Sequence, residues 1–95
     1  MPAGEYQIVL SKKAHKQVKD VKSAGLDGHV RRLLDVLRAD PLGEPPPYEE
    51  LRGDLKGCYS RRINLHNRLV YEIFPDRQTV RILSMFTHYA ALHSD

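Results

Sequence analysis

The sequence predicts an α+β fold, in which two N-terminal helices pack on one side of a mainly antiparallel four-stranded sheet. Two observations lead to this prediction. Apolar residues recur with a helical period between residues 11 and 40, and segments rich in β-branched and aromatic residues lie on both sides of that stretch. The 95 residues are expected to form one domain, because each half alone would bury too little surface to fold.

The first elements in the chain are a short strand and a helix. Residues 6–10 consist mainly of β-forming residues, and Ser11 directly after them has a side-chain oxygen that can cap the start of a helix. Gly25 is expected to end this helix. Its apolar residues are spaced at i, i+4 and i+7: Ala14, Val18 and Val21.

The second helix has the strongest periodicity in the chain. Asp27 is the candidate cap at its start. The pair Asp40–Pro41 is expected to end it, because the residue before a proline disfavours helical backbone. Its apolar stripe follows the i, i+3, i+4, i+7 spacing: Val30, Leu33, Leu34 and Leu37. The short link between the two helices predicts an antiparallel hairpin.

Residues 41–57 form an unusual connecting segment with four prolines and three glycines. Long ordered connections in a small domain tend to carry function. We expect an ordered loop, stiffened by its prolines and anchored to the body of the protein by Tyr48 and Leu51.

Three strands are predicted in the C-terminal half, at residues 59–65, 68–74 and 79–86. Asn67 fits the turn between the first two, and residues 75–78 fit the turn between the last two. The final strand is apolar on both faces, which is typical of a central strand, so it should lie between its hairpin partner and the N-terminal strand. Its apolar residues are Val80, Ile82 and Phe86 on one face and Leu83 and Met85 on the other.

Charge and composition limit the function classes. Lys and Arg exceed Asp and Glu by 15 − 12 = 3, and residues 52–95 hold seven basic and four acidic residues, which favours a polyanionic partner such as nucleic acid. The single cysteine, Cys58, excludes an intrachain disulfide and a multi-cysteine zinc site. No apolar run reaches the ~20 residues of a membrane span. The N-terminus lacks a signal-peptide pattern, so a cytoplasmic protein with no membrane partner is expected.

Residues with complementary chemistry gather around the predicted sheet. A carboxylate can take the proton of a 2′-hydroxyl, a guanidinium can stabilise the phosphorane, an imidazole can protonate the leaving 5′-oxygen, and an aromatic ring can stack on a base. These parts can cleave RNA without a metal. The candidates are Glu49 or its rival Glu50, Arg68, His88 and Tyr89, with Arg61 and Arg62 on alternating faces of one strand, so that only one of them can enter the site.

The pairing register of the last hairpin decides whether Arg68 and His88 share a face of the sheet. They share one if Phe74 lies opposite Val80, and they lie on opposite faces if Phe74 lies opposite Thr79.

Other basic residues have simpler explanations. Lys12 and Lys16 on the polar face of the first helix are candidates for RNA contact, although a solvated helix face is the simpler account. The remaining histidines have no metal-ligand spacing and are expected at the surface, so no metal or other cofactor is predicted: His15, His29, His66 and His93.

The order and spacing of several motifs resemble the YoeB/Txe branch of the RelE superfamily of bacterial toxins. The motifs are Tyr48-Glu49-Glu50-Leu51, Gly57-Cys58-Tyr59-Ser60-Arg61-Arg62-Ile63, Asn67-Arg68-Leu69-Val70-Tyr71 and His88-Tyr89. The chain departs from the family pattern at Phe86-Thr87, where the family has Arg-Tyr, and at residues 90–95, a short tail beyond the family's usual end.

The resemblance implies a RelE/YoeB-like microbial ribonuclease fold and the toxin of a type II toxin–antitoxin pair. Such a toxin is a ribosome-dependent endoribonuclease that cuts mRNA in the A site and so inhibits translation. The family pattern implies Glu49 as general base, Arg68 as stabiliser of the phosphorane, His88 as general acid, Tyr89 as the residue that orients or stacks the substrate, and Arg62 as a phosphate contact.

The resemblance also implies partners. They are a cognate antitoxin, the 70S ribosome with its 30S A site, mRNA, and operator DNA through the antitoxin complex alone, and homodimers occur in this branch. The alternative is a non-catalytic ribosome- or antitoxin-binding module that acts in operon autorepression, its activity eroded by the Phe86-Thr87 change.

Overall fold

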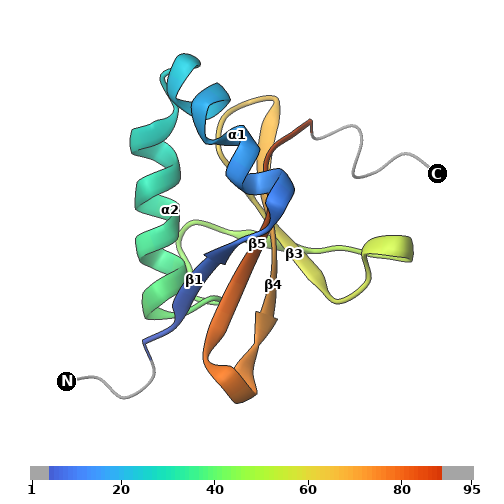
Figure 1. Cartoon of the computed structure of the whole chain (residues 1–95). Coiled ribbons are helices and arrows are strands. Elements are labelled where there is room, and N and C mark those ends of the chain that lie inside the picture. The colour runs from blue at the N-terminus through green and yellow to red at the C-terminus, as the bar shows by residue number, and fades with distance from the viewer. Residues whose placement is uncertain (1–4, 89–95) are drawn as a thin grey trace.

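The computed structural model describes residues 5–88 and has the predicted α+β architecture, with both helices on the same side of one sheet (Figure 1). Neither helix in this range is long and apolar enough to span a membrane. The elements are β1 (Gln7–Leu10), α1 (Lys12–Ser23), α2 (Asp27–Ala39), β2 (Tyr48–Glu50), the 3-10 turn η1 (Gly53–Leu55), β3 (Cys58–Arg62), β4 (Asn67–Phe74), the 3-10 turn η2 (Pro75–Arg77) and β5 (Thr79–His88).

The sheet has five strands, in the order β1-β5-β4-β3-β2. β1 runs parallel to β5, and every other pair is antiparallel. The prediction that β5 lies between β4 and β1 is confirmed. The predicted strand count of four was wrong, because β2 forms within the segment that was expected to be loop throughout. Its three residues pair with β3 in the register Tyr48↔Arg61, Glu49↔Ser60 and Glu50↔Tyr59.

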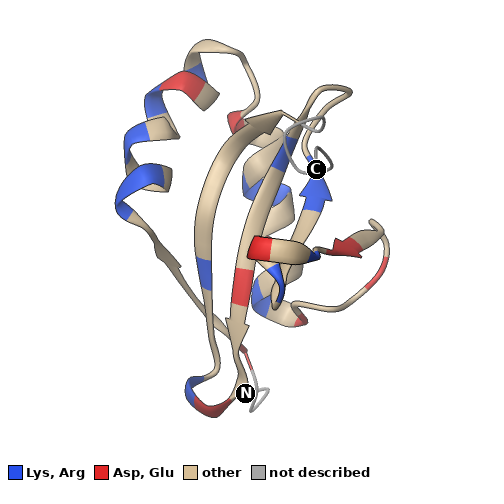
Figure 2. Ribbon diagram, turned by 90° about the vertical axis from the view of Figure 1, so that its right-hand side faces the viewer, with Lys and Arg blue, Asp and Glu red and all other residues tan. Residues whose placement is uncertain are grey.

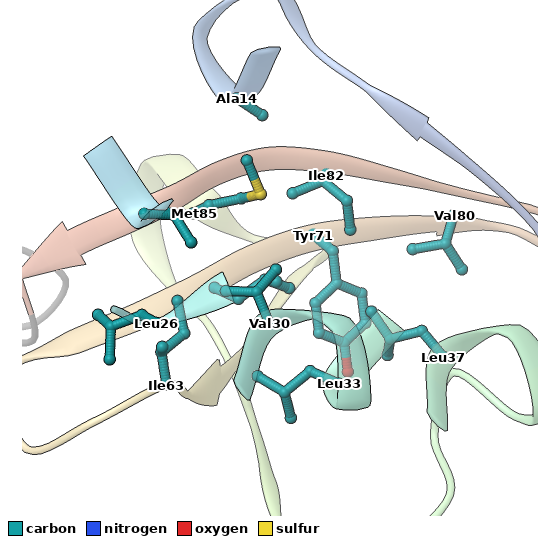
Figure 3. Close-up of a cluster of buried hydrophobic side chains, with 12 residues drawn as sticks. Ala14, Leu26, Val30, Leu33, Leu37, Ile63, Tyr71, Val80, Ile82 and Met85 are labelled. Carbon is teal, nitrogen blue, oxygen red and sulfur yellow. The ribbon is translucent and has the colours of Figure 1, made fainter. Parts of the chain in front are cut away.

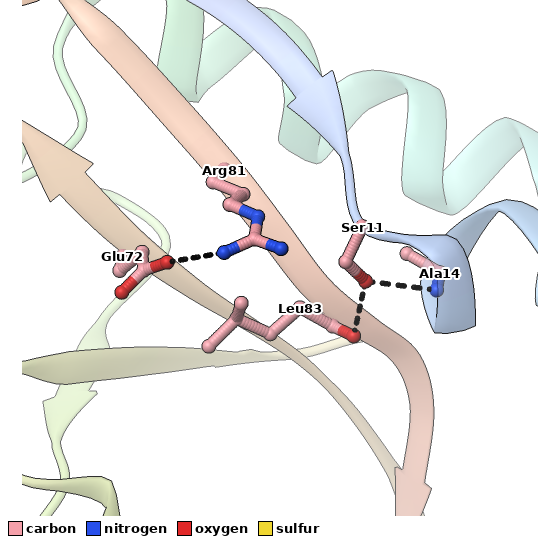
Figure 4. Close-up of polar contacts among 5 residues, drawn as sticks. All are labelled: Ser11, Ala14, Glu72, Arg81 and Leu83. Carbon is pink, nitrogen blue, oxygen red and sulfur yellow. Dashed lines mark hydrogen bonds and ion pairs between the residues drawn. The ribbon is translucent and has the colours of Figure 1, made fainter.

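The start of α1 follows the sequence prediction. The backbone N–H of Ala14 donates to Ser11 Oγ at 3.0 Å, and the Ser11 hydroxyl donates to the carbonyl oxygen of Leu83 in β5 at 2.8 Å (Figure 4). One side chain therefore caps the helix and joins it to the sheet. At the other end, Gly25 adopts the left-handed backbone with φ of 72°, which glycine tolerates without a Cβ clash.

The start of α2 differs from the prediction. Asp27 is the first residue of the helix rather than its cap, and the preceding Leu26 makes no side-chain capping hydrogen bond. Asp27 lies instead in the first turn, where its negative charge complements the helix dipole. The helix ends as predicted, because Asp40 before Pro41 adopts extended backbone.

Asn64 makes the turn between β3 and β4, whereas Asn67 was the predicted turn residue. The side-chain oxygen of Asn64 accepts hydrogen bonds from the backbone N–H groups of His66 at 3.1 Å and Asn67 at 2.8 Å. This local turn chemistry ends β3 at Arg62, three residues before the predicted end, and makes Asn67 the first residue of β4.

The main core lies between the helices and the sheet (Figure 3). Its buried members are Ala14, Val21, Leu26, Val30, Leu33, Leu37, Ile63, Leu69, Tyr71, Val80, Ile82 and Met85. Burial of each large aliphatic side chain contributes about 1.5–3 kcal/mol. The periodicity of both helices correctly predicts which of their residues face this core.

Met85 lies on the same side as Val80 and Ile82, although strict alternation predicts the other face. The reason is the register shift between Val70 and Tyr71, where one step along β4 corresponds to two steps along β5, from Ile82 to Ser84. Each extra residue reverses the alternation of side chains beyond it.

Ser11→Ala should lower the free energy of unfolding by about 1–2 kcal/mol, because it removes the helix cap and the bond to β5. Urea unfolding followed by circular dichroism measures this. Ser23→Ala, at the exposed end of α1, is the control and should change little. Equal unfolding midpoints for Ser11→Ala and the wild type would contradict the assigned role.

Candidate functional site

The sheet face opposite the helices carries the polar residues of interest. Glu49 pairs with Ser60 across β2 and β3, and Arg62 pairs with Arg68 across β3 and β4. Because paired residues point to the same face and alternate residues share it, these four side chains lie on one face. Figure 2 shows acidic β2 in red beside the basic end of β3 in blue.

Arg68 and Glu49 form an ion pair on this face. Arg68 Nη2 lies 3.4 Å from Glu49 Oε1, with 8% of the Arg68 side chain and 41% of the Glu49 side chain exposed. The Nε–H of Arg68 also donates to Ser60 Oγ at 2.8 Å. The guanidinium is therefore held in place by β3 as well as by the carboxylate, whereas Glu49 keeps an accessible surface.

Ser60 is a site residue that the sequence analysis missed. It is fully buried, and both its Oγ and its carbonyl oxygen accept hydrogen bonds from Arg68. The sequence did contain an indication that Ser60 belongs to the site. Ser60 and the candidate Arg62 are two residues apart on a predicted strand and must therefore share a face.

Arg62 is exposed and lies directly across from Arg68 at the end of β3. Two like charges opposite each other repel, and an anion between them would relieve that repulsion. A phosphate contact is the role that the family resemblance implies for Arg62, and it stays a prediction.

The β4–β5 register places His88 differently from Arg68. Phe74 pairs with Thr79, and after the two register shifts Arg68 lies opposite Thr87 and His88 opposite Asn67. By strand alternation Thr87, and not His88, shares the face of Arg68. Ser84 Oγ is hydrogen-bonded to Thr87 Oγ1.

His66 lies against His88 at this end of the sheet. The two imidazole rings stack at a centroid distance of 5.8 Å and an interplanar angle of 14°. His66 is exposed, as predicted. Tyr89 and the tail at residues 90–95 lie outside the described residues.

Of the two candidate arginines on β3, Arg61 is the one that points away from the site face and is not available to RNA. Its side chain is fully buried on the helix side of the sheet, where it bonds to Tyr71 and to the carbonyl oxygens of Pro41 and Pro46. Arg61 follows the fully buried Ser60 and precedes Arg62 along β3, so alternation directs it away from the face that carries Glu49 and Arg68.

Lys12 and Lys16 are exposed on α1, on the helix side of the sheet. The fold therefore does not bring them next to Glu49 and Arg68, which lie on the opposite face. A solvated helix face accounts for their positions.

Cys58 is packed in a small apolar cluster with Leu51 and Val70 on the face opposite the helices. Burial raises the pKa of the Cys58 thiol above its ordinary value of 9.0, and the negative charge of Glu72 raises it further. A thiol that keeps its proton is a weak nucleophile. Among residues 5–88, no three side chains of His, Cys, Asp and Glu come together in a group that could hold a metal ion.

A family model described as "YoeB-like toxin of bacterial type II toxin-antitoxin system" matches residues 12–89. The chain belongs to this family of YoeB-like toxins. Toxin YoeB of Mycobacterium bovis is 39% identical over a stretch that covers 54% of this chain and 60% of that protein. The match therefore spans less than two thirds of that relative.

Solved structures of YoeB toxins have the same fold as this YoeB-like toxin. The YoeB dimer of Staphylococcus aureus superposes with a TM-score of 0.76 at 28% identity, covering 90% of this chain and 99% of that one. A heterotetrameric YoeB–YefM toxin–antitoxin complex of Staphylococcus aureus gives a TM-score of 0.75 at 29% identity, covering 88% of this chain and 98% of the matched chain.

The raised pKa of Cys58 predicts a pH effect on the stability of this toxin. The folded thiol stays protonated where the unfolded thiol loses its proton, so stability that is intact below about pH 9 falls as the pH rises above it. Urea unfolding between about pH 8 and pH 10.5 should show a steeper decline for the wild type than for Cys58→Ala. Parallel declines would refute this contribution.

Proposed function

We propose that this YoeB-like toxin is an endoribonuclease that cleaves mRNA in the ribosomal A site by acid–base chemistry of its own side chains, without a metal. The observation that carries this proposal is the Glu49–Arg68 pair, in which an accessible carboxylate lies 3.4 Å from a buried guanidinium. A proton acceptor and a stabiliser of phosphorane charge thus lie within reach of one phosphodiester.

Glu49 would take the proton from the 2′-hydroxyl, whose oxygen then attacks the adjacent phosphorus. Arg68 would stabilise the additional negative charge of the phosphorane, and exposed Arg62 would contact a neighbouring phosphate. His88 would donate a proton to the departing 5′-oxygen, and Tyr89 would orient or stack a base. The products are a 2′,3′-cyclic phosphate, which water can then open to a 3′-phosphate, and a free 5′-hydroxyl.

The hydrogen bond from Arg68 to Ser60 supports this sequence of steps. When Glu49 turns from the guanidinium to the 2′-hydroxyl, Arg68 keeps its bond to Ser60 Oγ at 2.8 Å. The cation therefore stays in place while its carboxylate partner acts as a base, as electrostatic stabilisation by a preorganised group requires.

The proposed partners follow the family. A cognate antitoxin would neutralise the toxin, as the YoeB–YefM complex of Staphylococcus aureus illustrates for its own pair. The ribosome would present the mRNA in the cytoplasm, because the described part of the site face carries few cations with which to bind RNA by itself. Operator DNA would be bound through the antitoxin complex, and homodimerisation would match the YoeB dimer of Staphylococcus aureus.

One observation favours a second candidate function. Because Thr87 lies opposite Arg68, the proposed acid His88 does not share the face of the proposed base. A non-catalytic module that occupies the ribosome or binds the antitoxin, and acts in operon autorepression, would need no acid there.

Arg68→Ala should lower the rate of mRNA cleavage on programmed ribosomes by about 10²–10³-fold, because it removes the phosphorane-stabilising cation. Glu49→Gln and His88→Ala should each lower it by about 10²–10⁴-fold, because each removes a proton-transfer group. Primer extension on the mRNA measures the cut, and growth after induction measures toxicity.

Arg81→Ala is the matched control. Arg81 Nη1 lies 3.4 Å from Glu72 Oε1 on the same face of the sheet, at another position (Figure 4). Its loss should leave cleavage intact. Translation arrest without any A-site cut by the wild type would exclude the nuclease and favour the non-catalytic module.

A further inference from the structure

Arg61 is a fully buried cation at the back of the sheet, behind the proposed site. Its Nε–H donates to the hydroxyl of Tyr71 at 3.1 Å, and its two terminal nitrogens donate to the carbonyl oxygens of Pro46 and Pro41. Its Cζ also lies 5.4 Å from the ring centroid of Tyr48 and 6.0 Å from that of Tyr71. Every nitrogen of the guanidinium is thus used.

This environment is unusual for a buried charge. Within residues 5–88, Arg61 has no carboxylate within 4.0 Å, and its polar and ring contacts are with two carbonyl oxygens, one hydroxyl and two aromatic rings. Burying a guanidinium is costly unless all its donors are satisfied, so each of these contacts constrains its neighbours. Burial raises the pKa of Tyr71, while the hydrogen bond and charge of Arg61 lower it.

The carbonyl groups that Arg61 binds lie at the two ends of the proline-rich segment. Pro41 follows α2, and Pro46 lies two residues before β2. Prolines have no backbone N–H group, so they cannot donate the backbone hydrogen bonds that would attach this segment to the sheet. One guanidinium supplies those donors instead, and the Tyr71 hydroxyl adds a bond to the Pro41 carbonyl oxygen at 2.9 Å.

The contacts of Arg61 also extend to the neighbour of the proposed general base. Tyr48 is the cross-strand partner of Arg61, with its ring near the guanidinium, and Glu49 is the following residue. Because side chains alternate, fixing Tyr48 on the helix side directs Glu49 to the opposite side, towards Arg68. β2 is a three-residue edge strand, so its own ladder bonds constrain it weakly.

We propose that Arg61 is a positioning residue that acts through the Pro41–Pro46 segment and Tyr48 to hold Glu49 beside Arg68. This inference rests on the proposed nuclease function, since it assigns Arg61 a part in the same reaction. It implies that the site is built from both sides of the sheet: Arg61 and Tyr71 behind it, and Glu49, Ser60 and Arg68 in front.

Arg61→Met tests the proposal, because it keeps most of the side-chain volume and removes all the donors. In the full-length toxin on programmed ribosomes, kcat should fall about 10–100-fold, as expected for a displaced catalytic group. KM should stay within about twofold, because the fully buried Arg61 offers no surface to RNA. Arg61→Lys should recover part of kcat, since an ammonium can bind one of the two carbonyl groups.

Tyr71→Phe is the milder second variant and keeps the proposal testable if Arg61→Met does not fold. It removes the hydroxyl bonds to Arg61 and Pro41 while the ring still fills the core, and it should lower kcat less than Arg61→Met does. Val30→Ala, in the α2 part of the core, serves as the stability control: it should lower the melting temperature with kcat unchanged below that temperature.

A double-mutant cycle separates positioning from general destabilisation. If Arg61 acts through Glu49, Arg61→Met should have little further effect on the residual cleavage by Glu49→Gln. A full additional loss in that background, or wild-type kcat in both Arg61→Met and Tyr71→Phe, would overturn the proposal.

Hydrogen exchange provides a readout that does not depend on cleavage. Arg61→Met should speed exchange of the β2 amides, while the β4–β5 amides stay protected. If the wild type cuts no mRNA, the proposed function fails, and the role of Arg61 in catalysis fails with it. The hydrogen-exchange rates of the β2 amides would still show whether Arg61 holds β2 in place. Unchanged β2 protection would overturn that hold even in an active nuclease.

Discussion

The buried guanidinium of Arg61 is the constraint on which the site face of the sheet depends. Its donors join the segment after α2 to β3 and β4, and so connect the helical half of the chain to the hairpins. A buried charge tolerates few alternative arrangements, because each lost hydrogen bond leaves an unsatisfied polar group. The short strand β2 is therefore held in one position, and the carboxylate of Glu49 with it.

The two faces of the sheet differ in the side chains that they carry. The helix side holds the apolar core around Tyr71 (Figure 3), and the other side holds a small apolar cluster and the polar group of Glu49, Ser60 and Arg68. Alternation along β3 links the two, since Arg61 points to one side and its neighbours Ser60 and Arg62 to the other.

Much of the fold could be predicted from local patterns. Helical periodicity predicted α1 and α2, and the Ser11 cap and the central position of β5 were also predicted correctly. Asp27 and Asn67 were assigned the wrong local roles: Asp27 is the first residue of α2 rather than its cap, and Asn64 makes the turn that was assigned to Asn67. Of the candidate site, Glu49 and Arg68 were both named from the sequence, but their ion pair is known only from the structure. The burial of Arg61 was not foreseen, because arginine on a strand is usually solvent-exposed.

The sequence by itself determined the type and order of most elements, because periodicity, capping and proline effects act between residues a few positions apart. Tertiary structure alone decided three features: the strand β2, the two register shifts that place Thr87 opposite Arg68, and the side of the sheet on which each arginine lies. Each depends on hydrogen bonds between residues distant in the chain, and a shift of one residue in that pairing reverses the face of every side chain beyond it.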